Sequence, residues 1–192
     1  MLRRGRLPFD VTVDDDSAVR RMGWCAVKVV RSASDHEATL TRWAYRQRLA
    51  PRVVDAYRAG DVHLVLVTRW HGVTLQELMD KARSAWSDAA LDVSLVSLLA
   101  RMVSCGALRT DMHPRNIVVS RWTYEAKVID WDERCVCDDA ATMGADFERW
   151  MDEFVGHWAV RLPATREAVS ALIQSATPAA AAAAPPAAHA PR

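Results

Sequence analysis

The chain has 192 residues, 51% hydrophobic and 26% charged, with eight tryptophans, which is enough apolar material to bury the core of one domain. Its 25 basic and 24 acidic residues leave a net charge of +1, which excludes a protein drawn to nucleic acid or membranes by its overall field. No window of 18 apolar residues occurs, and the opening MLRRGRLPFDV has a basic patch without an apolar signal-peptide core, so we expect a soluble cytoplasmic protein, in the host cell if it is viral.

The first part of the chain switches between the periods of strands and helices. WCAVKVV (24–30) predicts a strand, and DHEATLTRWAYRQRLA (35–50) predicts a helix that ends before Pro51. PRVVDAY (51–57) and VHLVLVT (62–68) are two strand-like runs separated by a short polar turn, which predicts a hairpin.

The next elements are mainly helical. TLQELMDKA (74–82) predicts a helix, and a second follows from apolar side chains at the spacing i, i+3, i+4, i+7, i+8, with Gly106 as its stop signal. These apolar residues are Leu95, Leu98, Leu99, Met102 and Val103. IVVS (117–120) and AKVID (126–130) then predict a short pair of strands around a turn.

The last part predicts two more helices and a tail. Helical spacing links Phe147 to Trp158, and TREAVSALIQ (165–174) favours a further helix. Residues 176–192 are rich in Ala and Pro and are predicted to be disordered. The order of elements predicts an α+β domain over residues 1–175, with a small strand-rich lobe at about 1–70 and a minimal helical lobe at about 71–175.

Three polar residues stand out because of their places beside the short strands. In LRTDMHPRNIVV (108–119), Asp111 and Asn116 precede a strand, and Asp130 ends the next one. Taken singly, Asp111 suits a turn before Pro114, and Asn116 suits a hydrogen-bonded loop. Together, two carboxylates and an amide offer only oxygen ligands, which favours Mg²⁺ and phosphate over zinc and indicates phosphoryl transfer.

The motif D-M-H-P-R-N followed by I-D-W resembles the catalytic and metal-binding loops of the protein-kinase-like fold, in the form found in aminoglycoside and choline phosphotransferases and in small atypical kinases. The resemblance implies that Asp111 is the catalytic base and that His113 touches the transferring phosphoryl group. It also implies that Asn116 and Asp130 hold the Mg²⁺ that bridges the phosphates of ATP.

The resemblance extends to the strand-rich half of the chain. The Ala26-Val27-Lys28 run is similar to the Val-Ala-Ile-Lys motif, which implies that Lys28 binds phosphate. Its counter-charge would be Glu37, although Ser34-x-x-Glu37 also matches a capping box, in which Glu37 binds the start of its own helix. LVLVTRWHG (64–72) resembles the fifth strand and hinge, so backbone groups near Thr68 and Trp70 would bind adenine.

The expected activity is that of an atypical serine/threonine protein kinase, which transfers the γ-phosphoryl group of ATP to a hydroxyl. One alternative keeps this chemistry but uses a small alcohol, as aminoglycoside and choline kinases do, although the chain leaves little room for the helical insert that builds their acceptor site. The other is a pseudokinase, a nucleotide-binding regulatory module. The absence of a glycine-rich loop before Lys28, and Arg109 where the family has His, favour this alternative.

Overall fold

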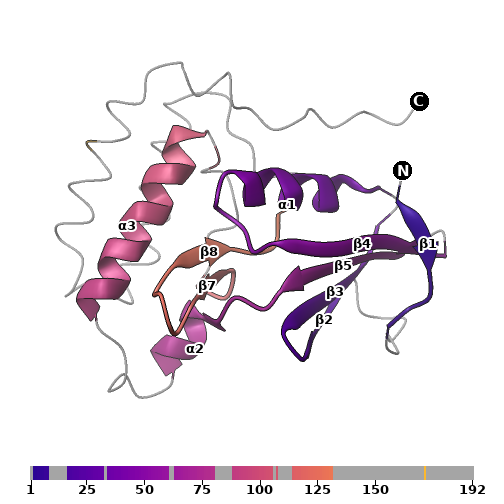
Figure 1. Ribbon diagram of the computed structural model, residues 1–192, viewed down its shortest axis with the longest axis horizontal. Coiled ribbons are helices and arrows are strands. Elements are labelled where there is room, and N and C mark those ends of the chain that lie inside the picture. Colours follow the sequence, from indigo (N-terminus) through magenta and orange to yellow (C-terminus); the bar gives the residue numbers. More distant parts are fainter. Residues whose placement is uncertain are drawn as a thin grey trace.

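The computed structural model describes residues 2–8, 17–32, 34–60, 63–80, 88–105, 107, 114–131 and 171. Within these ranges the chain is a mixed α+β structure with a five-stranded sheet, a three-stranded sheet and three helices (Figure 1). The elements in chain order are β1 (Arg3–Gly5), β2 (Ser17–Met22), β3 (Cys25–Arg31), α1 (His36–Arg46), β4 (Val53–Ala59), β5 (His63–Arg69), β6 (Val73–Thr74), α2 (Leu75–Asp80), α3 (Asp88–Ser104), β7 (Ile117–Val119) and β8 (Ala126–Val128).

The five-stranded sheet has the order β1-β4-β5-β3-β2, in which β1 pairs with β4 in parallel and the other neighbours are antiparallel. The predicted hairpin is confirmed as β4 and β5. In the β2–β3 hairpin Met22 lies opposite Cys25, so the turn has two residues. Gly23 is the first of them and has a φ of 61°, a value that such tight turns need and that glycine adopts without steric cost.

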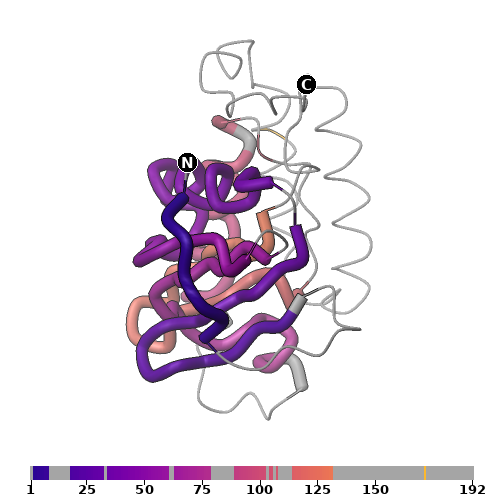
Figure 2. The backbone as a smooth tube through the Cα atoms, turned by 90° about the vertical axis from the view of Figure 1, so that its right-hand side faces the viewer, coloured from indigo at the N-terminus to yellow at the C-terminus, as the bar shows by residue number. Residues whose placement is uncertain are grey.

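The two faces of this sheet bury different side chains because residues alternate along each strand. Ala38 of α1 packs on one face against Ala56, Leu64 and Leu66. The other face carries a second cluster, formed by Val27, Val29, Ala59 and Val65. Figure 1 shows α1 lying along the sheet, and Figure 2, viewed from the β1 side, shows β1 at the near edge. The alternation therefore fixes which β3 residues face α1.

The largest core joins α1 and α3 to the three-stranded sheet, whose order is β6-β7-β8. The apolar stripe predicted for α3 is buried at Leu95, Leu98, Leu99 and Met102. Two hydrogen bonds tie β8 to its neighbours, from Ala126 N to Ser94 Oγ at 2.8 Å and from Val128 N to the Leu49 carbonyl at 2.7 Å. Because Leu49 follows α1, β8 is held directly against the α1 segment.

The short connection from β5 to β6 passes very close to β7. A Cβ atom placed on Gly72 would lie 1.7 Å from the carbonyl oxygen of Val119, so only glycine fits there. At the start of α2, Thr74 and Glu77 form a reciprocal capping box, with hydrogen bonds of 2.9 and 3.1 Å. These contacts fix the route of the chain from the large sheet to the small one.

The structure contains most of the predicted elements. The predicted strands of β3, β4, β5, β7 and β8 and the helices α1, α2 and α3 are confirmed with shifts of a few residues at their ends. Strands β1, β2 and β6 were not predicted. The helices predicted around 147–158 and 165–174, and the tail at 176–192, lie outside the described residues. No helix within the described ranges is long and apolar enough to cross a membrane.

Candidate active site

Lys28 lies on β3 with its side chain on the face of the sheet that α1 covers. The register places it directly opposite Leu66 of β5, and directly opposed residues of antiparallel strands share a face. Leu66 packs with Ala38 of α1 in the same cluster. The neighbours Val27 and Val29 are buried on the other face. The strand therefore directs the Lys28 ammonium toward α1.

Glu37, in the first turn of α1, accepts a hydrogen bond from the Lys28 ammonium, with 2.7 Å between Nζ and Oε1. Only 17% of the Lys28 side chain and 11% of the Glu37 side chain are exposed. The capping-box alternative does not fit, because the N-cap position of α1 is Asp35 rather than Ser34, and the Ser34 amide donates to Ser32 Oγ. The predicted Lys28–Glu37 ion pair is therefore confirmed.

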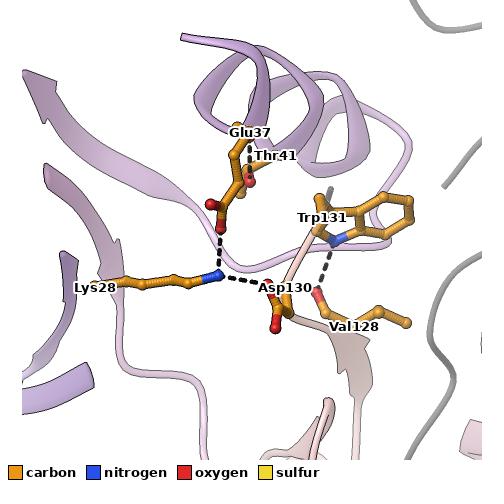
Figure 3. A network of polar contacts seen from close by, with 6 residues as sticks. All are labelled: Lys28, Glu37, Thr41, Val128, Asp130 and Trp131. Atoms are coloured by element: carbon orange, nitrogen blue, oxygen red, sulfur yellow. Dashed lines mark hydrogen bonds and ion pairs between the residues drawn. The ribbon is translucent and has the colours of Figure 1, made fainter. Parts of the chain in front are cut away.

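Asp130, two residues after β8 of the three-stranded sheet, completes the network. Its carboxylate forms an ion pair with Lys28 and keeps 46% of its side chain exposed (Figure 3). Its φ is 66°, in the left-handed region, where aspartate is found more often than most residues other than glycine; residues held there often cluster at functional sites. The network joins three segments, since Asp130 follows Lys28 by 102 residues.

Trp131 holds the strained backbone at Asp130 in place. Its side chain is fully buried, its indole N–H donates to the Val128 carbonyl at 2.9 Å, and its ring meets the Trp43 ring of α1 edge-on, with 6.0 Å between centroids. Edge-to-face contacts of this kind favour one ring orientation over others. The sequence signal is the I-D-W motif itself, although its tryptophan was not recognised there as an anchor.

The charge of Lys28 follows from two opposing effects. Burial of the ammonium disfavours its charge, but the carboxylates of Glu37 and Asp130 outweigh burial and hold the pKa of Lys28 above the ordinary lysine value of 10.5. Lys28 is therefore a cation at neutral pH. An ammonium has three N–H donors, and within the described ranges its two ion pairs use two of them.

Asn116 lies at the same end of the β7–β8 pair as Asp130. Its backbone carbonyl oxygen accepts a hydrogen bond from the backbone N–H of Ile129 at 2.8 Å. The next residue, Ile117, lies opposite Val128 in the register. The preceding Pro114 is fixed too, since its carbonyl accepts from the Gln76 amide at 3.1 Å. The structure thus brings Asn116 and Asp130 to one edge. Asp111 and His113 lie outside the described residues.

The face of the sheet beside Lys28 continues toward the predicted hinge. Ala26 lies opposite Thr68, and Val19, with 59% of its surface exposed, lies opposite Lys28. Trp70 follows β5, and its backbone N–H donates to the Trp24 carbonyl at 2.7 Å, so this N–H is already used. Val19 was missed from the sequence because the strand that carries it was not predicted.

The ring of Trp70 makes a second contact that was not predicted. The guanidinium carbon of Arg21 lies 4.9 Å from the ring centroid, a distance typical of a cation–π interaction. Arg21 is opposite Ala26 and therefore on the Lys28 face of the sheet. Arg21 and Trp70 therefore meet on the Lys28 side of the sheet, next to Ala26.

No protein-family model matches this chain, and no curated protein matches it.

Proposed function

We propose that the chain is an ATP-dependent phosphotransferase with a two-lobed, protein-kinase-like fold, and that it transfers the γ-phosphoryl group to a serine or threonine hydroxyl of a protein. The network of Lys28, Glu37 and Asp130 carries the proposal. It places a mostly buried ammonium on the large sheet next to a half-exposed carboxylate that follows the small sheet. An ammonium beside a carboxylate can position phosphate and metal together, which is most of what phosphoryl transfer requires from a protein.

Lys28 would hold the phosphates of the nucleotide. Its remaining N–H donor is available for a phosphate oxygen, while Glu37 fixes the direction of the side chain. Because the two carboxylates raise the pKa of Lys28, the ammonium stays charged throughout the neutral range and can neutralise the phosphates. Glu37 would thus act as a positioning residue for Lys28.

The residues beside Lys28 fit Mg²⁺. No group of three or more His, Cys, Asp and Glu side chains within the described residues forms a metal cluster. Mg²⁺ does not need one, since it usually binds one or two carboxylates together with phosphates and waters. The Asp130 carboxylate and the Asn116 amide are oxygen donors at one edge of the small sheet. A bound Mg²⁺ would neutralise charge on the phosphates.

The base of the nucleotide would lie against the continuous sheet face formed by Val19, Ala26 and Thr68. A half-apolar surface of this kind suits the flat face of a purine. The edge of the base would meet backbone groups of the connection that follows Thr68. Since the N–H of Trp70 is bound to Trp24, Trp70 would contribute its carbonyl oxygen.

The transfer step assigns a role to the sequence motif that precedes β7. The acceptor hydroxyl attacks the γ-phosphorus and gives its proton to the Asp111 carboxylate. A new O–P bond forms as the bond from the γ-phosphorus to the bridging oxygen breaks, which releases ADP. His113 would contact the phosphoryl oxygens during this step, as the family resemblance implies.

The first test is binding of ATP with Mg²⁺. At ATP concentrations a hundred times Kd, bound nucleotide stabilises the folded state by about 2.7 kcal/mol, which corresponds to about 5–10 °C in Tm for a domain of this size. We expect Lys28→Met to weaken binding at least tenfold, and Asp130→Asn to remove its dependence on Mg²⁺. The matched control is Lys127→Met, because Lys127 is also a mostly buried lysine, paired with Glu125 at 3.1 Å, but lies outside the site.

The second test is transfer of a labelled γ-phosphoryl group, followed as autophosphorylation and ADP release. Transfer by the wild type that is lost in Asp111→Ala supports the enzyme. Binding without transfer in either protein would instead indicate a nucleotide-binding regulatory module, the pseudokinase alternative. If ATP does not bind at all, or if Lys28→Met and Lys127→Met behave alike, the proposal is wrong.

A further inference from the structure

The near-neutral charge of the whole chain conceals a local excess of arginine. Residues 38–54 contain four arginines and neither an aspartate nor a glutamate. These arginines are Arg42, Arg46, Arg48 and Arg52. Elsewhere the basic and acidic residues nearly cancel, so this segment is unusual within its own chain. It begins in α1 and ends as β4 begins.

The structure exposes these arginines. Arg42 and Arg46 are exposed on α1 and lie one helical turn apart, about 6 Å along its axis. The opposite side of the helix is buried through Leu40, Trp43 and Ala44. Tyr45, between the two arginines in sequence, keeps 42% of its surface exposed. Solvent therefore meets a cationic helix face that includes an aromatic ring.

The turn after α1 extends this face. Arg48 is exposed and has a φ of 61°, and Arg52 is exposed at the approach to β4. The Arg52 carbonyl accepts a hydrogen bond from the amide of Arg69, another exposed arginine, so the end of β5 adds a fifth positive charge beside the turn. We define the arginine surface as the four arginines of residues 38–54 together with Tyr45.

Two arginines outside this surface are paired with carboxylates. Arg3 pairs with Asp55, and Arg58 lies 3.9 Å from Asp35. Among the residues that the structure describes, no carboxylate lies within ion-pair distance of the four arginines on the arginine surface. The positive charges of Arg42 and Arg46, one helical turn apart, repel each other and therefore destabilise α1 slightly. The arrangement is thus not there to stabilise the helix.

From this surface we infer that the chain binds the phosphodiester backbone of single-stranded nucleic acid, a partner beyond the proposed phosphotransferase function. Guanidinium groups match phosphate oxygens with two parallel hydrogen bonds, and the segment contains no lysine. An exposed tyrosine between them offers a face on which a base can stack. The combination of arginine and an exposed aromatic ring favours nucleic acid over an acidic peptide, which has no bases to stack.

This binding is separate from the nucleotide site. Glu37 faces Lys28 from the first turn of α1, whereas Arg46 ends the helix and Arg48 lies in the turn after it. A chain can therefore lose one function and keep the other. Neither Arg42 nor Arg46 has a role in the candidate active site, so substitutions at these positions leave the phosphotransferase proposal untouched.

The test is fluorescence anisotropy with short labelled strands of poly(U) and poly(dT), a duplex, and a polyglutamate peptide. The variant Arg42→Glu/Arg46→Glu is compared with the control Arg31→Glu/Arg121→Glu, which makes the same charge change at two exposed arginines outside the surface. We expect Arg42→Glu/Arg46→Glu to weaken single-strand binding at least tenfold, and the control variant to weaken it less than threefold. The slope of log K against log salt should become shallower by about 1.4 in the first variant, since each phosphate contact contributes about 0.7.

Tyr45→Leu separates stacking from charge. It should weaken binding of both single strands about tenfold and leave duplex binding unchanged, since duplex bases are already stacked. Equal affinity for poly(U) and poly(dT) would indicate that only the phosphodiester backbone is recognised. Preference for poly(U) would indicate contacts to the 2′-hydroxyl. Both results support the proposal. If circular dichroism shows that the double glutamate variant is unfolded, Arg42→Gln/Arg46→Gln replaces it, with at least fivefold weakening expected.

Three results would overturn the inference. The first is no binding of either strand at low salt. The second is equal weakening by the Arg42/Arg46 variant and by its control, which would show that charge acts without a defined surface. The third is tighter binding of polyglutamate than of the single strands, which would assign the surface to an acidic protein partner.

Discussion

The most informative substitution for the stability of the site is Glu37→Gln, which keeps the shape of the side chain but removes its charge. The Lys28 and Glu37 charges are 2.7 Å apart, and at an effective dielectric constant of about 20 such charges attract by about 6 kcal/mol. Desolvation of two mostly buried groups offsets much of that attraction. Loss of one partner of a buried pair usually costs about 3–5 kcal/mol, but Asp130 still compensates Lys28.

We therefore expect Glu37→Gln to lower the free energy of unfolding by about 2 kcal/mol, which is about 4–8 °C in Tm. The assay is urea unfolding at neutral pH, followed by tryptophan fluorescence and by circular dichroism to check that the two transitions coincide. The control is Arg3→Gln, which breaks the Arg3–Asp55 pair, whose side chains are 61% and 36% exposed. That variant should be indistinguishable from wild type. If Glu37→Gln changed the free energy of unfolding by less than about 0.5 kcal/mol, the Lys28–Glu37 pair would contribute no more than a solvent-exposed ion pair, and the estimate would be refuted.

Three further results are expected. The raised pKa of Lys28 means that the folded state holds its proton more tightly than the unfolded state. The stability lost in Lys28→Met should therefore be constant near neutral pH and shrink as the pH rises above 10.5. If the loss of stability stayed the same at high pH, the ion pairs of Lys28 would be contradicted. Gly72→Ala should destabilise the protein by at least about 3 kcal/mol in urea unfolding, because its Cβ would overlap the Val119 backbone. The control is Gly60→Ala, where the space is open but φ is 65°, and it should cost about 1 kcal/mol. Equal costs for the two variants would exclude the close approach of Gly72 to Val119. Burial raises the pKa of the Cys105 thiol to about 11, so peptide mapping after iodoacetamide treatment at pH 8 should find Cys105 labelled only in unfolded protein, and rapid labelling in the native state would refute its burial.

Most of the described fold could be predicted because its elements bury regular apolar patterns. The stripe of α3 and the alternation of β4 and β5 are examples, and both are confirmed. Strand β2 was missed because its two consecutive arginines, Arg20 and Arg21, interrupt any apolar alternation; as an edge strand it does not need one. Strands β1 and β6 have three and two residues, too few to carry a period.

The candidate site was predictable where its signals were local and uncertain where they were not. Lys28 and Asp130 follow from short motifs beside strands. The role of Glu37 could not be decided locally, since the pattern Ser34-x-x-Glu37 is compatible with a helix cap as well as an ion pair. Only the tertiary structure sets the carboxylate against β3. The capping box of α2, by contrast, is readable from its own Thr74-x-x-Glu77 pattern.

Two features of the structure had no counterpart in the sequence prediction. The direct ion pair of Lys28 with Asp130 spans 102 residues, a separation that no local pattern encodes. The arginine surface was hidden by averaging, because a net charge near zero for the whole chain does not show how its charges are distributed along the sequence. Counting charges within segments, rather than over the chain, would have revealed it.

The central claim is that Asn116 and Asp130 hold a metal ion with the nucleotide phosphates beside Lys28, and that Asp111 faces the same point. A crystal structure with Mg²⁺ and a non-hydrolysable ATP analogue tests it most directly. We predict a metal bound to the Asp130 carboxylate and the Asn116 amide oxygen, a phosphate oxygen hydrogen-bonded to Lys28 Nζ, and the Asp111 carboxylate directed at the γ-phosphate. Nucleotide bound elsewhere, or a metal without Asp130 as a ligand, would contradict the account.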